Sequence, residues 1–134
     1  MVQNNALHAA AFEGRLRKVR ALVKTGLDVN VRSTVGDNET PLYLATSKGH
    51  KEVVRVLLEA GADTDQASTT NQGATPLFVS AQNGNVEVVR ALVEAGANVD
   101  QALTTNGATP LFVSAQNGNV EVVRALVEAG ANVD

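Results

Sequence analysis

The segment from Gly73 to Asp100 returns letter for letter as Gly107 to Asp134. No other feature of this 134-residue chain limits its fold as strongly, because a unit that recurs must bury its apolar face against copies of itself. The repeated segment therefore predicts an array of similar units stacked side by side.

Two weaker copies of this unit precede the identical pair. Thr40-Pro41-Leu42 corresponds to Thr75-Pro76-Leu77, and a more degraded version begins near Asn5. Glycine pairs with a constant spacing keep the register through all copies: Gly14 and Gly26, Gly49 and Gly61, Gly84 and Gly96, and Gly118 and Gly130. We therefore predict one domain over residues 1–134, built from four repeats at approximately 4–34, 35–69, 70–103 and 104–134.

Each repeat contains the signals of two short helices followed by a loop. In the third repeat, Thr75 is suited to cap a helix that starts at Pro76, and Gly84 is suited to end it. Apolar residues at helical spacing mark a second helix that stops at Gly96: Val86, Val89, Leu92 and Val93. The remaining segments are rich in turn residues, which favours an extended finger or hairpin between repeats.

The Thr-Pro-Leu opening, the Glu-Val-Val-Arg helix and the Glu-Ala-Gly-Ala ending resemble the ankyrin repeat. The resemblance covers about residues 4–134 and implies an all-α solenoid of helix-turn-helix units joined by hairpin-like fingers. The family usually has a histidine after Thr-Pro-Leu, but this chain has Tyr43, Phe78 and Phe112 there. We expect these rings to fill the core between repeats rather than to stack on a ligand. Asn38 replaces the glycine of later repeats, and asparagine tolerates the positive φ of that turn.

The sequence lacks the residue constellations of catalysis. It contains no cysteine, its two histidines (His8 and His50) stand far apart, and its glycines are single residues at helix ends. Ser80 and Ser114 lie inside repeated helices without a neighbouring base, so we interpret them as packing residues. These observations predict no enzymatic activity, no cofactor and no bound metal.

Charge and hydropathy indicate the environment and the kind of partner. The net charge is −3. The basic residues of the first repeat are typical of a solvated helix face, and an anion or nucleic-acid site is the weaker alternative. No apolar run is long enough to span a bilayer, and the N-terminus has no signal-peptide pattern. We expect an intracellular protein, cytoplasmic or nuclear, that binds neither nucleic acid nor membrane.

The resemblance also implies an extended concave surface that binds another protein. On this chain, that surface takes residues from the first helices and from the finger tips. The implied set is Phe12, Glu13, Arg32, Val35, Asp37, Glu39, Ser47, Lys48, Asn71, Gln72, Gln82, Asn83, Leu103, Thr105, Asn106, Gln116 and Asn117. Phe12 could instead cap the first core layer, Leu103 could fold back on its own finger, and the Gln/Asn pairs could form only a neutral, solvated groove.

The two ends of the array differ in polarity. The second helix of the first repeat, Leu16 to Lys24, is charged on one side and resembles a cap, whereas the last repeat has no clear polar outer face. We expect a fragment of a longer array, an engineered or duplicated array, or a subunit that self-associates end to end through its last repeat. Our functional hypothesis is a protein-interaction scaffold. The alternatives are a structural spacer, a regulatory segment of a larger protein, or an array without a dedicated partner.

Overall fold

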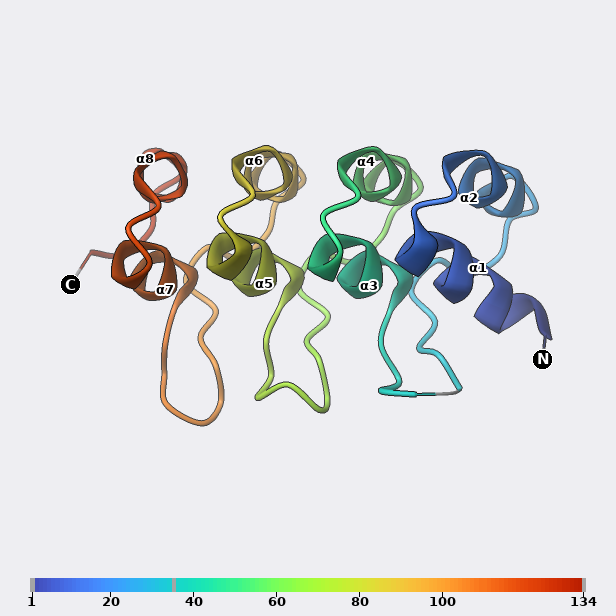
Figure 1. Cartoon of the computed structure of the whole chain (residues 1–134), viewed down its shortest axis with the longest axis horizontal. Coiled ribbons are helices and arrows are strands. Elements are labelled where there is room, and N and C mark those ends of the chain that lie inside the picture. Colours follow the sequence, from blue (N-terminus) through green and yellow to red (C-terminus); the bar gives the residue numbers. More distant parts are fainter. Residues whose placement is uncertain (1, 35, 134) are drawn as a thin grey trace.

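The computed structural model describes residues 2–34 and 36–133, with side chains from residue 5 onwards. These residues form eight helices and no strand, in four consecutive helix-turn-helix pairs. The helices are α1 Val2–Glu13, α2 Leu16–Val23, α3 Pro41–Ser47, α4 Lys51–Glu59, α5 Pro76–Asn83, α6 Val86–Glu94, α7 Pro110–Gln116 and α8 Val120–Glu128. Figure 1 shows one row of pairs, with the first helices in one layer and the second helices in another. The predicted all-α solenoid is confirmed.

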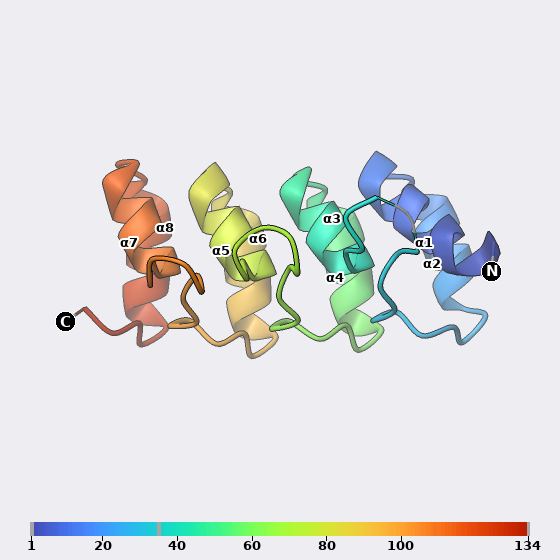
Figure 2. The same ribbon diagram turned by 90° about the horizontal axis from the view of Figure 1, so that it is seen from below.

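A loop between successive pairs projects from the array as a finger. We call residues 31–40, 66–75 and 101–109 finger 1, finger 2 and finger 3, and Figures 1 and 2 show them following one another along the same side of the array. In each finger a backbone hydrogen bond of 2.8–2.9 Å joins the two arms, from the N–H of Ser33, Ser68 or Leu103 to the opposite carbonyl. The fingers are hairpin-like in outline, but their described residues form no strands.

The predicted helix starts are correct in the three later repeats. The hydroxyl oxygens of Thr40, Thr75 and Thr109 each accept a hydrogen bond from the backbone N–H three residues later, at 3.1 Å. A proline follows each threonine at the first helical position, where its missing N–H leaves no bond unmade. Each cap stabilises its helix by about 1 kcal/mol and sets the residue at which the finger turns into a helix.

Left-handed backbone occurs at Gly84 and Asn38, where we predicted it, and at one further non-glycine residue among those described. Gly84 ends α5 with a φ of 72°, and Asn38 has a φ of 61°. Gln72 also has a positive φ, 56°, directly before Gly73. Because Gln72 is the additional residue of finger 2 relative to finger 3, the longer finger is accommodated by a turn that we did not predict.

The buried face of α6 differs from the one that the apolar spacing predicted. In α6, Val88, Val89 and Leu92 are fully buried, whereas Val86 and Val93 are only partly buried. Val88 was not in the predicted face. It is buried where α6 packs against α5 of its own repeat and α4 of the preceding one, and the equivalent Val122 is buried although no described repeat follows it.

Neighbouring repeats are joined by a regular series of bonds from side chain to backbone. Asn30, Asp65 and Asp100 each accept a hydrogen bond from a backbone N–H of the following repeat, at 2.7–2.9 Å. His50 donates from Nε2 to the Phe12 carbonyl at 3.0 Å, so this histidine has a structural role. These bonds set the spacing and register that place the fingers beside the first helices.

The three rings that replace the family histidine do not share one environment. Tyr43 and Phe78 are 7% and 5% exposed, as expected for core residues between repeats. Phe112 is 56% exposed, so the expectation is wrong for this ring. The reason is that no described repeat packs against the outer side of α7.

Candidate functional site

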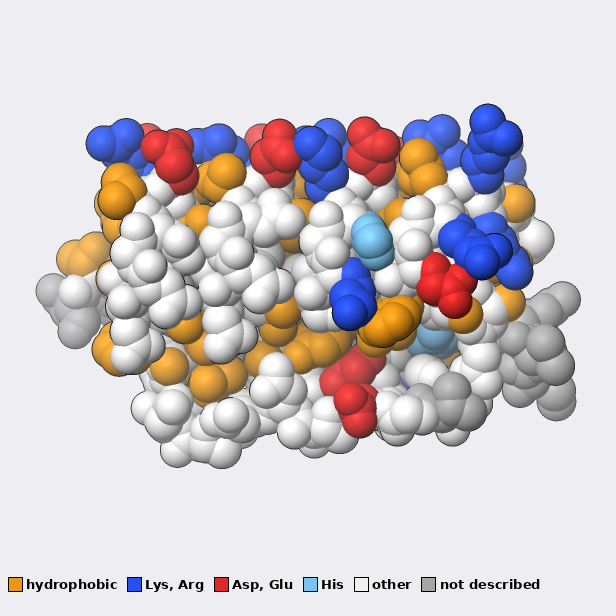
Figure 3. Space-filling view, in the orientation of Figure 1, with side chains coloured by type: hydrophobic (Ala, Val, Ile, Leu, Met, Phe, Trp, Pro, Cys, Tyr) orange, Lys and Arg blue, Asp and Glu red, His pale blue; other side chains and the backbone are white. Residues whose placement is uncertain are grey.

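The side of the array that carries the fingers is the candidate site. Each finger stands beside the first helix that follows it, and a row of side chains runs along these helices (Figures 1 and 3). We call the surface formed by the fingers and the first helices the groove. The predicted contact residues that the structure describes belong to these helices, their C-terminal caps or the fingers, while Val35 lies outside the described residues.

Phe12 is the large apolar side chain exposed at the N-terminal end of the groove. It is 44% exposed, and the Lys48 ammonium lies 4.8 Å from its ring centroid. Glu13, next to it, pairs with Arg15 at 2.7 Å. Ser47 donates its hydroxyl to the Leu44 carbonyl at 2.9 Å, so this side chain is already bonded within its own helix. Phe12 and Lys48 are therefore exposed side chains at this end of the groove.

Arg32 and Glu39, both predicted contact residues, join finger 1 to finger 2. The Arg32 guanidinium donates to the Ala67 carbonyl at 2.7 Å and to the Asn38 carbonyl at 3.3 Å. The Glu39 carboxylate is 4% exposed, and its Oε2 accepts hydrogen bonds from the Ser68 and Thr70 hydroxyls. Asp37, by contrast, is exposed. The first finger thus combines a buried polar network with an exposed acidic tip.

Finger 2 is joined to finger 3 by a second set of bonds. The Gln72 carbonyl accepts hydrogen bonds from the Thr104 N–H at 2.8 Å and from its hydroxyl at 3.0 Å. The Thr105 hydroxyl donates to Gln72 Oε1. On the other side, Asn71 Nδ2 donates to the Tyr43 hydroxyl at 2.8 Å. The fingers are therefore braced against each other and against the helices, which pre-organises the groove.

Burial raises the pKa of Tyr43 above its ordinary value of 10.0, while the hydrogen bond from Asn71 opposes this shift. Because Tyr43 is the only tyrosine, absorbance titration should give one midpoint above the ordinary value, higher still in Asn71→Ala. The raised pKa favours the protonated phenol in the folded state. The protonated Tyr43 phenol therefore contributes fully to the free energy of unfolding below the unfolded-state pKa. This contribution is lost as the pH rises through the folded-state pKa. The denatured chain is the control, and a folded-state midpoint at or below that of the denatured chain would contradict this cause.

The C-terminal half of the groove is lined by uncharged polar groups. A hollow of about 280 Å³ between fingers 2 and 3 is lined by Asn71, Gln72, Phe78, Gln82, Leu103, Asn106, Ala108, Phe112, Val113 and Gln116. Asn83 and Asn117 donate to the Ser47 and Gln82 carbonyls at 3.4 and 3.2 Å, which braces neighbouring helix ends. The Gln82 and Gln116 side chains are exposed. Leu103 is partly buried against the core and also lines the hollow.

A second hollow lies at the N-terminal end of the groove, between α1, α3 and finger 1. This cleft has a volume of about 470 Å³ and is lined by Asn5, His8, Ala9, Phe12, Glu13, Ser33, Gly36, Asp37, Glu39 and Leu44. His8 Nε2 donates to the Val31 carbonyl at 2.6 Å and is buried. The cleft combines apolar walls with three carboxylates, which the hollow in the C-terminal half does not have.

Comparison with known proteins assigns the family. A family model described as ankyrin repeats (3 copies) matches residues 2–68 and 65–134, which together span nearly the whole chain. The chain belongs to the ankyrin-repeat family. A search of the curated proteins found no match. Ankyrin repeats are generally protein–protein interaction modules, so the family and the exposed groove indicate the same class of function.

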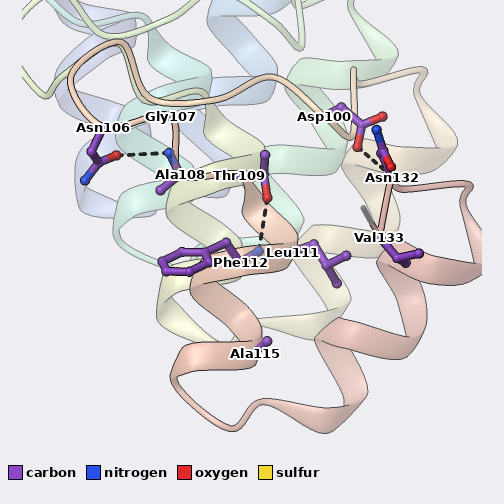
Figure 4. A pocket seen from close by; sticks show the side chains of 10 residues that line it. All are labelled: Asp100, Asn106, Gly107, Ala108, Thr109, Leu111, Phe112, Ala115, Asn132 and Val133. Atoms are coloured by element: carbon purple, nitrogen blue, oxygen red, sulfur yellow. Dashed lines mark hydrogen bonds between the residues drawn. The ribbon is translucent and has the colours of Figure 1, made fainter.

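The last ankyrin repeat leaves a broad apolar face open. Figure 4 shows the hollow on this face, about 670 Å³ in volume, with Leu111, Phe112 and Val133 among the side chains around it. Among the described residues, every exposed large apolar side chain except Phe12 belongs to this repeat: Phe112, Val120, Val127 and Val133. Exposed apolar surface of the described residues is thus concentrated on this repeat.

The identical third ankyrin repeat shows what covers the same face. A Cβ built on Gly84 would meet the Asn119 side chain at 3.0 Å, whereas one built on Gly118 meets nothing within 4 Å. Phe78 is buried and Phe112 is exposed, although their sequence surroundings are the same. The neighbouring repeat therefore accounts for the difference.

Among the residues described, no group of three histidine or acidic side chains is placed to hold a metal ion. No described helix has the length and apolar character needed to cross a membrane. The Ser80 and Ser114 hydroxyls donate to the Leu77 and Leu111 carbonyls at 2.9 and 3.0 Å, which agrees with packing residues.

Proposed function

We propose that this chain is a non-enzymatic scaffold, a single domain over residues 1–134 that binds a protein partner through the groove and the finger tips. The observation that carries this proposal is the row of exposed groove side chains on fingers that are braced to each other and to the helices. A pre-organised surface pays less conformational entropy on binding than a mobile one. The proposal includes an intracellular setting, cytoplasmic or nuclear, and no nucleic-acid partner.

The groove is expected to bind linear peptides selected from a random phage-displayed library. A triple variant, Phe12→Ala, Gln82→Ala and Gln116→Ala, should weaken the selected peptides by about tenfold or more, because it removes one apolar anchor and two hydrogen-bonding side chains. Affinity is measured by isothermal titration calorimetry.

The matched control is Arg90→Ala with Arg124→Ala, which changes exposed side chains of the second helices, α6 and α8. This control should bind as the parent chain does, and circular dichroism should show that all variants are folded. A groove variant that binds every selected peptide unchanged would favour the spacer alternative.

A second candidate function is end-to-end association through the open face of the last repeat. The exposed apolar side chains of that repeat support it, because at the corresponding positions of the third repeat Phe78 is buried and the valines are partly buried. Sedimentation equilibrium should show an average mass that rises with concentration, and Phe112→Glu with Val127→Glu should abolish the rise. An unchanging monomer mass over the whole concentration range would exclude this candidate.

A further inference from the structure

The cleft at the N-terminal end of the groove has a wall and a rim of different chemistry. Ala9, Phe12 and Leu44 supply apolar surface, and the acidic residues that line the cleft are Glu13, Asp37 and Glu39. No lysine or arginine is among the described residues that line it. A cleft that combines low-dielectric walls with charges of one sign concentrates the field of those charges at its mouth.

The carboxylates of the cleft are incompletely compensated. Glu39 is 4% exposed, and its Oε1 accepts no hydrogen bond from any described residue. The nearest cation is Arg32, whose Nη1 lies 4.0 Å from Oε1, and its guanidinium donates to the Ala67 and Asn38 carbonyls instead. The cleft therefore contains a buried carboxylate that retains acceptor capacity.

The other two carboxylates differ in their pairing. Glu13 is paired with Arg15 at 2.7 Å on the surface, where water screens such a pair. For Asp37, the described residues supply no cationic group within ion-pairing distance. Asp37 lies exposed on finger 1, so its charge is available to a partner.

The apolar wall also favours a cation of a particular shape. Lys48 already places its ammonium 4.8 Å from the Phe12 ring centroid, which shows that the ring accepts a cation, and the ring is still 44% exposed. An arginine side chain has an apolar stem, and its planar guanidinium stacks on aromatic faces and pairs with carboxylates. We propose that this cleft binds an arginine side chain of the protein partner.

This assignment rests on the proposed scaffold function and predicts which end of the groove binds a charged part of the partner. Glu39 corresponds to Ala74 and Ala108 in the later repeats, so the buried carboxylate occurs only at finger 1. Figure 3 shows charged side chains on the N-terminal half of the groove and uncharged ones on its C-terminal half. The partner is thus selected by charge at repeats 1 and 2, and by neutral hydrogen bonding at repeats 3 and 4.

The test uses two small probes that differ in charge but hardly in shape: N-acetyl-arginine amide and N-acetyl-citrulline amide. Each is titrated at millimolar concentration into the ¹⁵N-labelled chain, followed by NMR. The arginine probe should give saturable shifts centred on Phe12 and Asp37 that weaken with added salt. The citrulline probe should give no saturable shift there.

Asp37→Asn should weaken the arginine probe by about fivefold or more, because it removes the exposed carboxylate and leaves the fold intact. Glu59→Gln, which changes an exposed carboxylate on α4, is the matched control and should leave the affinity unchanged. Equal shifts from both probes, no saturable shift with arginine, or an Asp37→Asn variant with unchanged affinity would overturn the assignment.

The peptide selection separates this inference from the scaffold function. Selected peptides that need the groove and carry arginine support both proposals. Peptides that need the groove but carry no arginine keep the scaffold function and overturn the arginine site. Saturable arginine binding without any groove-dependent peptide would keep the site and overturn the scaffold function.

Discussion

Replacing Phe78 with alanine is expected to lower the free energy of unfolding by about 3–5 kcal/mol, the usual loss for a buried aromatic side chain. Phe78 is 5% exposed and belongs to the continuous core that runs through the repeats. The surrounding core is made of short aliphatic side chains, which cannot reach across the cavity that alanine would leave. Urea-induced unfolding, monitored by circular dichroism at low protein concentration, measures the loss.

The same replacement at Phe112 is the matched control, because the chain carries identical residues around both rings. Phe112 is 56% exposed, so Phe112→Ala should cost less than about 1 kcal/mol. Equal losses at both positions would contradict the open face and show that it is covered in solution. In that case the loss at Phe112 should fall as the protein is diluted, because association contributes to apparent stability by mass action.

Glu39→Ala is expected to lower the free energy of unfolding by about 2–3 kcal/mol, because hydrogen bonds to a charged group are stronger than neutral ones. The substitution removes the acceptor of the Ser68 and Thr70 hydroxyls and the partner of Arg32. Ser68 is buried, so its hydroxyl would lose this acceptor away from water. Urea-induced unfolding again gives the magnitude, and ¹⁵N NMR should show shifts spread over fingers 1 and 2.

Two variants control this result. Asp37→Ala removes an exposed carboxylate from the same finger and should change stability by no more than about 0.5 kcal/mol. Glu39→Gln keeps one acceptor oxygen and should lose about 1 kcal/mol. A Glu39→Ala variant as stable as Asp37→Ala would mean that the buried network does not hold the fingers together.

The parts of the fold that depend on local sequence were predictable. The caps at Thr40, Thr75 and Thr109 and the left-handed turn at Asn38 each involve residues close together in the chain. Val88 was missed because its burial needs contact with the preceding repeat as well as with α5, and the equivalent Val122 is 1% exposed although no described repeat follows α8. The apolar spacing along one helix predicts a single buried face and therefore contact with a single neighbouring helix.

The bonding of the candidate site was not predictable from the sequence. The role of Arg32, Glu39 and Asn71 at a partner surface stays a prediction, whereas the structure shows that they join elements far apart in sequence. One sequence signal could have indicated this network. Glu39 replaces the alanine that the later repeats have, and a charged residue at a position otherwise occupied by alanine needs partners of its own.

By itself, the sequence determined the repeated unit, the number of copies, and where the first helices of the three later repeats begin. Those features follow from caps, glycines and apolar spacing, which act over a few residues. Only the tertiary structure decided which copy of an identical residue is buried, since burial depends on the repeat that packs against it. Phe78 and Phe112 have the same sequence surroundings and opposite exposure for that reason.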